Sequence, residues 1–299
     1  MKDLKGTGKK MERRIIVTGA NGQLGRGINQ ILNQRMDFTI INADISETTA
    51  YCPIKLDIAN PVAVMNLVRD IKPEIIINCA AHTAVDLCET DQENAYRINA
   101  LGPKNLAVAA EALDAKLIHI STDYVFDGEG SSPYTEADTP NPTTVYGQTK
   151  LQGEEFVKEL CNKYFIIRTA WLYGEGKNFV KTMLSLAEKG NPIRVVSDQS
   201  GCPTSVLELT RAIYYLMDTS CYGTYHGVCQ GVTTWYDFAV EIFRLAGLNP
   251  EVIPVTSDEY KTAAKRPKYS VLEDKNLADM GYYMKPWAEA LKEYMDNLK

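Results

Sequence analysis

The chain has 299 residues, a formal net charge of −6 and an apolar content of 45%. This composition supports a sizeable globular core, and the acidic balance argues against a general nucleic-acid-binding protein, which would present a basic surface. No apolar run reaches the roughly 18 residues that a membrane-spanning helix needs, so we expect no membrane span.

Predicted strands and helices alternate in the first half of the chain. Residues 1–11, rich in lysine and glycine, are expected to be a disordered extension. The predicted strands are short apolar runs at residues 14–18, 38–42, 74–78, 116–120 and 164–168. The predicted helices cover residues 22–34, 61–71, 93–113 and 146–161. Apolar strands that alternate with helices form a parallel sheet covered on both faces, so the pattern predicts a doubly wound α/β fold.

The pattern loosens after residue 170. Helices are expected at residues 178–189, 206–217 and 235–246, with proline-containing turns between them. We therefore predict a sheet domain over residues 12–170 and, over residues 171–299, a smaller C-terminal lobe that is interleaved with the sheet.

The cysteines indicate a reducing environment. They number seven, form no Cys-x-x-Cys pair and do not cluster with histidine at the spacing of metal ligands. Free thiols, no metal site and a cytoplasmic location are expected from this pattern.

A glycine loop joins the first predicted strand to the first predicted helix. Gly19, Gly22 and Gly25 follow the spacing Gly-x-x-Gly-x-x-Gly. Gly19 permits a sharp turn, Gly22 lets the backbone approach a pyrophosphate, and Gly25 lets the helix pack closely. The free N–H groups at the helix start then face an anion. Between a strand and a helix, this loop predicts that residues 12–170 are an NAD(P)-binding Rossmann domain.

Further cofactor contacts are expected at the carboxyl edge of the sheet. Asp44 lies 19 residues after Gly25, at the end of the second strand, where it can accept hydrogen bonds from the adenosine ribose. Because a carboxylate repels a 2′-phosphate, Asp44 favours NADH over NADPH; the alternative is an aspartate that only forms a strand-end turn. The adenine edge is expected at Asp57 and Ile58, and the middle of the cofactor at Ala81, His82 and Thr83.

Three Tyr-x-x-x-Lys matches occur, and only one suits catalysis. They are Tyr51/Lys55, Tyr146/Lys150 and Tyr173/Lys177. Pro53 interrupts the first match, and Gly174 and Gly176 make the third a loop. Only Tyr146 and Lys150 begin a good helix, in which positions i and i+4 share a face.

Ketone reduction explains why this pair is needed. The reaction delivers a hydride to carbon and a proton to oxygen, and the phenol of Tyr146 can supply the proton. The ammonium of Lys150 would lower the pKa of the phenol and could also bind the nicotinamide ribose. A third group should hold the carbonyl oxygen, and Thr122 is the candidate, with Ser121 as the alternative.

Five blocks resemble the dTDP-4-dehydrorhamnose reductase family, in the order that the family has them. They are AAHTAVD (80–86), STDYVF (121–126), YGQTK (146–150), RTAWLY (168–173) and DQSGCPT (198–204). The resemblance implies a modified Rossmann domain with a smaller C-terminal substrate-binding lobe. It also implies reduction of the 4-keto group of dTDP-4-dehydro-L-rhamnose to give dTDP-L-rhamnose, with NADH or NADPH as cofactor.

The same resemblance implies roles for individual residues. Tyr146 resembles the proton donor, Lys150 its partner, and Thr122 the residue that tunes the pair. The matched cofactor contacts are Gly22, Gln23, Leu24, Asp44, Asp57, Ile58, Ala81, His82, Thr83 and Ile120. The matched substrate contacts are Thr122, Asp123 and Trp171, although Trp171 could also be a core aromatic residue.

Several alternatives stay open at this point. The enzyme could be another nucleotide-sugar 4-reductase or an epimerase, and a non-catalytic regulatory subunit such as the methionine adenosyltransferase beta subunit also resembles the family. Arg266 could meet the nucleotide diphosphate or form a surface ion pair. Some relatives form a magnesium-linked dimer through a glutamate where this chain has Arg26 and Gly27, so that metal site is not expected, while a homodimer is still a hypothesis.

Overall fold

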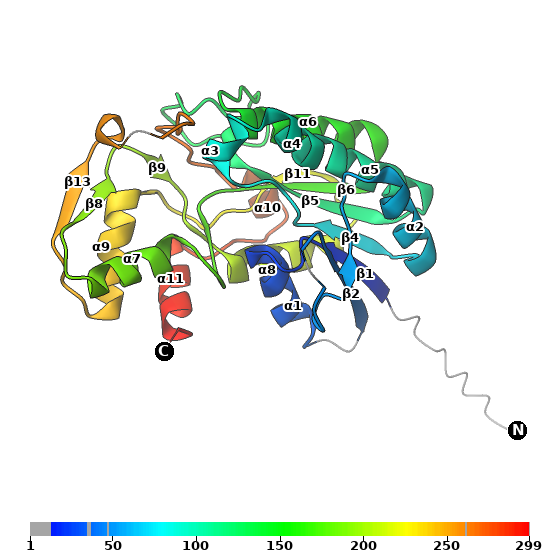
Figure 1. Cartoon of the computed structure of the whole chain (residues 1–299), viewed down its shortest axis with the longest axis horizontal. Helices are drawn as coiled ribbons and strands as arrows, with labels where there is room; N and C mark the ends of the chain where they lie inside the picture. Colours follow the sequence, from blue (N-terminus) through cyan, green and yellow to red (C-terminus); the bar gives the residue numbers. More distant parts are fainter. Residues whose placement is uncertain (1–12, 35–36, 47, 261, 299) are drawn as a thin grey trace, which may run out of the picture.

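The computed structural model describes residues 13–34, 37–46, 48–260 and 262–298. The expected disordered extension over residues 1–11 lies outside the described residues. A large sheet with helices on both faces makes up one side of the molecule, and a smaller lobe makes up the other (Figure 1). No helix among the described residues has the length and apolar character needed to cross a membrane.

The large sheet has seven strands, and every pair of neighbours is parallel. The strand order is β11-β6-β5-β4-β1-β2-β3. The strands are β1 (Arg13–Thr18), β2 (Phe38–Asp44), β3 (Ile54–Lys55), β4 (Ile75–Asn78), β5 (Lys116–Thr122), β6 (Tyr164–Thr169) and β11 (Gly223–His226). The predicted doubly wound parallel sheet is confirmed. Its order reverses between β1 and β4, and in such sheets ligands bind outside the carboxyl ends at this reversal.

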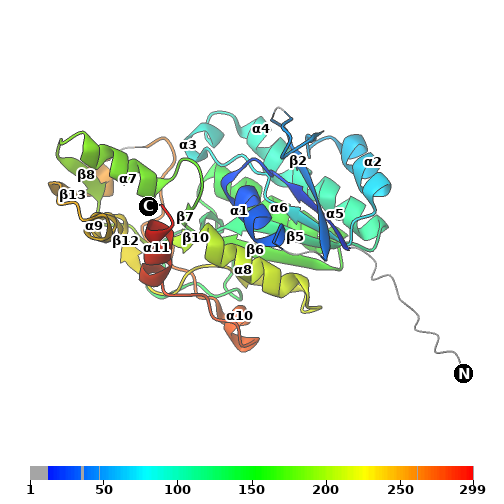
Figure 2. The same ribbon diagram turned by 90° about the horizontal axis from the view of Figure 1, so that it is seen from below.

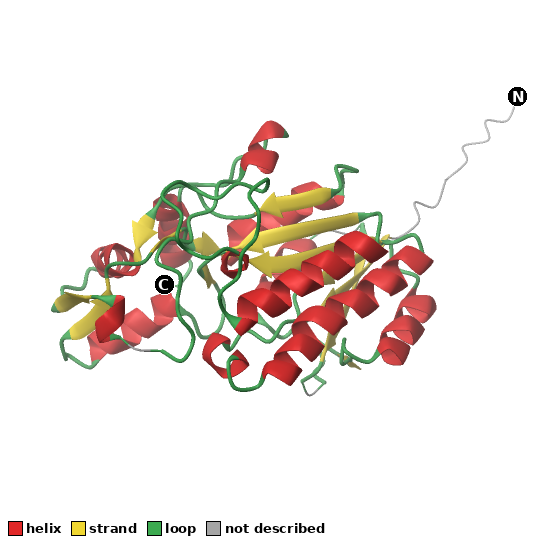
Figure 3. Ribbon diagram, turned by 90° about the horizontal axis from the view of Figure 1, so that it is seen from above, coloured by secondary structure: helices red, strands yellow, loops and turns green. Residues whose placement is uncertain are grey.

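Helices cover both faces because successive strand residues point to opposite sides. Ile15 and Val17 of β1 belong to the core beneath α1 (Gln23–Leu32) and α8 (Val206–Met217). Ile16 belongs to the core on the other face. The helices over that face are α2 (Pro61–Ile71), α5 (Gly102–Ala112) and α6 (Val145–Leu160). Figure 2 shows α1 and α8 on the first face, and Figure 3 shows helices over the opposite face.

The long helix expected over residues 93–113 is interrupted. It consists of α4 (Gln92–Tyr96), a π-helical turn (Arg97–Leu101) and α5. Pro103 has no N–H and cannot donate to the carbonyl of Asn99, so the regular ladder is lost there. The prediction of one regular helix is therefore wrong at this turn, and the widened turn carries the buried Asn99 side chain toward the carboxyl edge of the sheet.

The smaller lobe has its own core. Two parallel strands, β8 (Ile193–Val196) and β13 (Val252–Val255), pack with α7 (Phe179–Glu188), α9 (Trp235–Ala246) and α11 (Trp287–Asp296). Between α7 and α9 the chain returns to the large sheet to add α8 and β11. The remaining short elements are α3 (Val85–Cys88), α10 (Lys275–Asp279), β7 (Leu172–Tyr173), β9 (Ser200–Gly201), β10 (Thr204–Ser205), β12 (Thr233–Thr234) and two 3-10 turns (Asp123–Val125 and Ser257–Glu259).

The packing of α1 on the glycine loop predicts the effect of Gly25→Ala. A Cβ at Gly25 would lie 2.5 Å from the Gly19 carbonyl oxygen and 2.6 Å from Ala20 Cα, and backbone atoms cannot move away cheaply. We expect a loss of about 1–3 kcal/mol in the free energy of unfolding, as in other over-packed cores, measured by urea denaturation.

Gly22→Ala is the matched control. Its Cβ would meet only the Gly19 carbonyl oxygen, at 3.1 Å, so its cost should stay below about 1 kcal/mol. Equal stability of the two variants would contradict this account of Gly25.

Candidate active site

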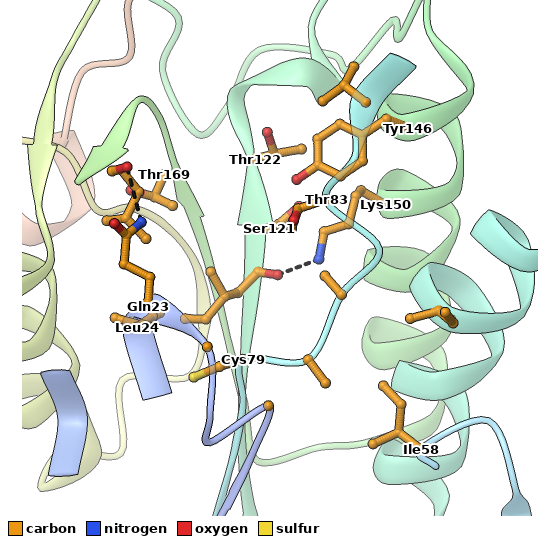
Figure 4. A pocket seen from close by; sticks show the side chains of 18 of the residues that line it. Gln23, Leu24, Ile58, Cys79, Thr83, Ser121, Thr122, Tyr146, Lys150 and Thr169 are labelled. Carbon is orange, nitrogen blue, oxygen red and sulfur yellow. Dashed lines mark hydrogen bonds between the residues drawn. The ribbon is translucent and has the colours of Figure 1, made fainter. Parts of the chain in front are cut away.

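A cavity of about 660 Å³ opens at the carboxyl edge of the large sheet, where the strand order reverses (Figure 4). Most of the predicted site residues line it. They are Gly19, Gly22, Gln23, Leu24, Asp44, Asp57, Ile58, Ala81, Thr83, Ile120, Thr122, Asp123, Tyr146, Lys150 and Trp171. Figure 4 shows Ile58 at one end of this pocket and Tyr146 with Thr122 at the other. Two predicted residues, Gly25 and His82, are not on its wall.

The glycine loop forms one side of the cavity. Gly19 has φ +65°, and a Cβ there would lie 2.6 Å from the Ala80 backbone nitrogen, so the turn requires glycine. Gly22 is the N-cap residue of α1, and no side chain caps this helix end. The free N–H groups of the first turn and the open space at Gly22 fit a pyrophosphate. Gly25 contributes instead to the packing of α1 on this loop.

Asp44 is the last residue of β2 and lines the cavity next to the glycine loop. Its carboxylate accepts hydrogen bonds from the backbone N–H groups of Asn21 (3.0 Å) and Ser46 (2.9 Å). Arg26 is paired with Glu175 at 3.2 Å. This part of the cavity therefore carries a carboxylate that two backbone N–H groups hold in place.

Asp57 and Ile58 form the next part of the wall. Asp57 accepts hydrogen bonds from the Arg97 guanidinium (2.6 Å) and from the backbone N–H of Ala59 (2.9 Å). Ile58 is buried and packs on the space left by Gly102, where a Cβ would lie 2.5 Å from Ile58 Cδ1. Ile58 therefore supplies an apolar wall, and the Asp57 carboxylate beside it is already paired with Arg97.

His82 does not line the cavity, although its neighbours Ala81 and Thr83 do. The side-chain amide of Asn99 accepts from the His82 backbone N–H (2.8 Å) and donates to its carbonyl (3.1 Å). The imidazole Nδ1 lies 3.7 Å from the Cys88 sulfur. Asn99, which the sequence did not single out, thus fixes the loop that brings Ala81 and Thr83 to the wall.

Tyr146 and Lys150 lie on the first turns of α6. This helix begins at Val145 because the Thr144 hydroxyl caps it, accepting from the Gly147 N–H at 3.1 Å. Tyr146 is 9% exposed and Lys150 is 2% exposed, on the face that closes the cavity. The lysine Nζ donates to the Ile120 carbonyl oxygen at 2.5 Å, the bond drawn in Figure 4.

Burial changes the acidity of both groups. It lowers the pKa of Lys150 to about 8, against the opposing effect of the Glu154 carboxylate. Burial also raises the pKa of Tyr146, and hydrogen bonding with Thr122 offsets part of the increase. The expected lowering of the tyrosine pKa by Lys150 is therefore not found in the protein alone.

Thr122 and Asp123 complete this end of the cavity. The Thr122 hydroxyl donates to Asp123 Oδ1 (2.9 Å) and accepts from the Tyr124 N–H (3.2 Å). Burial raises the pKa of Asp123 to about 6, although the hydrogen bond from Thr122 acts against it. The threonine oxygen is thereby oriented beside the phenol, which suits a shared contact with one substrate oxygen.

Ser121, the alternative to Thr122, is engaged elsewhere. Its hydroxyl donates to Glu154 Oε1 at 2.6 Å. Arg168 binds the same carboxylate with Nε at 2.9 Å and Nη2 at 2.8 Å, and all three residues are buried. The sequence did not reveal this cluster; the only signal was that Glu154 follows Lys150 by four residues on one helix face.

A second cavity of about 470 Å³ adjoins the first on the side of the smaller lobe. Asp123, Tyr124 and Trp171 line both cavities. Trp171 has φ +47° and stacks on Trp235, with ring centroids 3.5 Å apart and planes at 7°. The remaining wall consists of Phe179, Thr182, Met183, Leu186, Arg194, Val195, Val196, Gln199, Tyr260, Thr262, Arg266, Pro267 and Ser270. An elongated ligand could therefore reach from the catalytic groups into the lobe.

Known proteins resemble the chain over nearly its whole length. The RmlD substrate binding domain family matches residues 13–299. The chain belongs to the dTDP-4-dehydrorhamnose reductase family. A dTDP-4-dehydrorhamnose reductase from Aggregatibacter actinomycetemcomitans is 39% identical, covering 93% of this chain and 97% of the relative. The crystal structure of such a reductase from Clostridium acetobutylicum is 50% identical with a TM-score of 0.91, covering 95% of this chain and 99% of that one.

A further family member was solved with a cofactor. The dTDP-4-dehydrorhamnose reductase of Bacillus anthracis, in complex with NADP, is 45% identical with a TM-score of 0.91 and covers 96% of this chain and 100% of that one. The resemblance drawn from the five blocks is confirmed, and so is the predicted class, a nicotinamide-dependent oxidoreductase. The roles of individual residues stay predictions.

The buried ammonium of Lys150 predicts an unusual pH dependence of stability. Its pKa in the folded protein is about 8, below the unfolded value of 10.5. Below pH 8 the lysine is charged in both states, and the full cost of burying the ammonium opposes folding. Lys150→Met should therefore be more stable than the native protein at pH 7, by up to about 3 kcal/mol.

The difference should shrink as the pH rises through 8 to about 10, because the native lysine then folds in its neutral form. Urea denaturation of both proteins at pH 7, 8.5 and about 10 measures it. A stability difference that does not change with pH would contradict the burial of a charged lysine.

Proposed function

We propose that the protein reduces the 4-keto group of dTDP-4-dehydro-L-rhamnose to give dTDP-L-rhamnose, with NADH or NADPH as hydride source. One observation supports this most strongly. Thr122, Tyr146 and Lys150 line one end of a cavity that has a glycine loop along one side, and a second cavity adjoins this end. The names of the family members support the same substrate.

The bound nicotinamide would supply the hydride, and the protein supplies the proton and the orientation. The Thr122 hydroxyl, with its proton turned from Asp123 toward the substrate, and the Tyr146 phenol would both donate to the substrate carbonyl oxygen. The phenol donates its proton to that oxygen as the carbon is reduced. Lys150, held by the Ile120 carbonyl, places a positive charge where it stabilises the phenolate left behind.

The cofactor would lie along the first cavity. The glycine loop would hold the pyrophosphate, Asp44 the adenosine ribose, and Asp57 with Ile58 the adenine edge. Lys150 would also contact the nicotinamide ribose. Because Asp44 would lie close to a 2′-phosphate, we propose that NADH is used at least as well as NADPH.

The nucleotide sugar would extend from the first cavity into the second. Asp123 would accept hydrogen bonds from sugar hydroxyls, and Trp171 would pack on the sugar or wall the pocket. Arg266, which lines the second cavity, offers a cation to the diphosphate. This assigns residues 171–299 mainly to the substrate. A homodimer and a cytoplasmic location are further predictions from the sequence.

An absorbance assay at the NADH band with dTDP-4-dehydro-L-rhamnose tests the function. We expect one NADH consumed for each sugar reduced. An epimerase recycles its cofactor and would consume none, and a regulatory subunit would be inactive and would co-purify with a synthetase.

Tyr146→Phe tests the proton donor. The change keeps the ring and removes only the transferable proton, and a positioned general acid contributes about 10²–10⁴ in rate. We expect kcat to fall by about that factor while the affinity for NADH, measured by fluorescence titration, barely changes.

The other two tyrosines of the motif are the controls. Tyr51→Phe and Tyr173→Phe should leave kcat within about a few-fold of the native value. Tyr173 lies in the core of the lobe and the Tyr51 hydroxyl donates to the Gly25 carbonyl, so neither hydroxyl is placed to protonate the substrate. Loss of kcat in Tyr173→Phe with retention in Tyr146→Phe would overturn the assignment.

Asp44→Ala tests the cofactor preference. Removing the carboxylate removes its repulsion of a 2′-phosphate and its bond to the ribose, so kcat/KM should move toward NADPH. Steady-state kinetics with both cofactors measure the ratio. A native preference for NADPH of about tenfold or more would contradict the role of Asp44.

A further inference from the structure

A short segment from the smaller lobe reaches the large domain beside the second cavity. We call residues 262–268 the strap. Ala264 is buried within it, and Thr262, Arg266 and Pro267 line the second cavity. Pro267 packs against Gly128, where a Cβ would lie 2.3 Å from the proline ring. The strap is thus part of the wall that an elongated ligand would touch.

A single carboxylate of the large domain binds the strap at two points. Asp86 Oδ1 accepts from the Ala264 backbone N–H at 3.0 Å, and Oδ2 accepts from Arg266 Nη2 at 2.7 Å. Asp86 and Arg266 are 180 residues apart in the sequence. Each oxygen therefore has its own donor, so the carboxylate orients the Arg266 guanidinium as well as pairing with its charge.

Asp86 and Arg266 lie next to both parts of the site. Asp86 belongs to α3, which begins two residues after Thr83 of the cofactor cavity. Arg266 Nη1 donates to the Tyr124 hydroxyl at 3.0 Å. Tyr124 lines both cavities, and its ring meets that of Tyr146 edge-on with centroids 5.5 Å apart. The contact therefore joins the cofactor side, the catalytic tyrosine and the lobe.

We propose that Asp86 is a positioning residue for the nucleotide sugar. It holds the strap and the Arg266 guanidinium over the second cavity, so that the sugar end of the ligand lies at Tyr146. This inference rests on the proposed function for the identity of the ligand. The contact itself does not depend on that identity.

The same contact contributes little to folding. The side chains of Asp86 and Arg266 are 43% and 28% exposed, and partly exposed ion pairs stabilise proteins weakly. Asp86→Asn keeps the size of the side chain and removes the charge, so the unfolding midpoint should hardly move. The loss should instead be visible in ligand binding.

Kinetics provide the first test. Asp86→Asn should raise KM for dTDP-4-dehydro-L-rhamnose by at least about tenfold, the effect of a lost charge-assisted hydrogen bond. The value of kcat should stay within about threefold, and the affinity for NADH should be unchanged. Calorimetric titration with dTDP should show the same weakening.

Glu129→Gln is the matched control. Glu129 is another carboxylate that pairs with this segment, through Lys265 at 3.8 Å, but both partners are largely exposed. This variant should behave as the native protein in every assay. A double-mutant cycle then asks whether Asp86 acts through Arg266, because Asp86→Asn should cost little more once Arg266→Ala is present.

Limited trypsin digestion provides a second test, which needs no substrate. Lys265 is exposed, and cleavage after it requires the strap to leave its place. The Asp86→Asn protein should be cut at Lys265 several times faster than the native protein or Glu129→Gln.

Equal KM, dTDP affinity and cleavage rate in Asp86→Asn and the native protein would overturn the proposal. A fall in kcat and in NADH affinity together with a rise in KM would overturn it as well, since it would reveal general damage. If the native protein failed to reduce the keto sugar, the proposed function would fall, while dTDP titration and digestion would still test the strap.

Discussion

The buried ion pair between Glu154 and Arg168 holds α6, β5 and β6 together, and α6 and β5 carry the groups proposed for catalysis. Glu154 lies on α6 one turn after Lys150, Arg168 is at the end of β6, and Ser121 of β5 shares the same carboxylate. Burial would raise the pKa of Glu154, but the Arg168 guanidinium outweighs it and the pKa is lowered. The carboxylate therefore stays charged and directs both strands against the helix.

The position of the residues proposed for catalysis follows from the Glu154–Arg168 pair. Ser121, which is bound to Glu154, lies between Ile120 and Thr122 in β5. Fixing Ser121 therefore also fixes the Ile120 carbonyl that accepts from Lys150 and the Thr122 hydroxyl that bonds with Tyr146. Removing either member of such a buried pair leaves an uncompensated charge, which is far costlier than losing an exposed ion pair. The site is thus built on a buried ion pair whose two members, Glu154 and Arg168, do not line the cavity.

Burial shifts the pKa values of Lys150 and Tyr146 in opposite directions. It makes the Lys150 ammonium easier to deprotonate and the Tyr146 phenol harder to deprotonate. Both effects oppose the charged states that proton transfer passes through, so a bound cofactor and substrate must complete the electrostatics. Burying the Lys150 ammonium therefore lowers the free energy of unfolding, but it places a cation at the site.

Local patterns in the sequence were sufficient for five of the seven strands described in the large sheet, for the glycine loop and for placing Tyr146 with Lys150, alone among the three matches, at the start of a helix. Apolar periodicity and glycine or proline punctuation act over a few residues, and they are therefore readable along the chain. The break at Asn99 was missed because it depends on the close approach of Gly153 on α6 as well as on Pro103.

Local patterns of this kind do not predict contacts between residues that are distant in the sequence. The contact of Asn99 with the His82 backbone, the Glu154–Arg168 cluster and the Asp86–Arg266 contact each join segments that only folding brings together. A charged side chain in the sequence can be solvated, paired or bound to a ligand, and its burial and partner choose among these. The carboxyl edge of the sheet was therefore foreseeable as the site, whereas the network that orients its residues was a consequence of how β5, β6, α3 and the lobe pack in space.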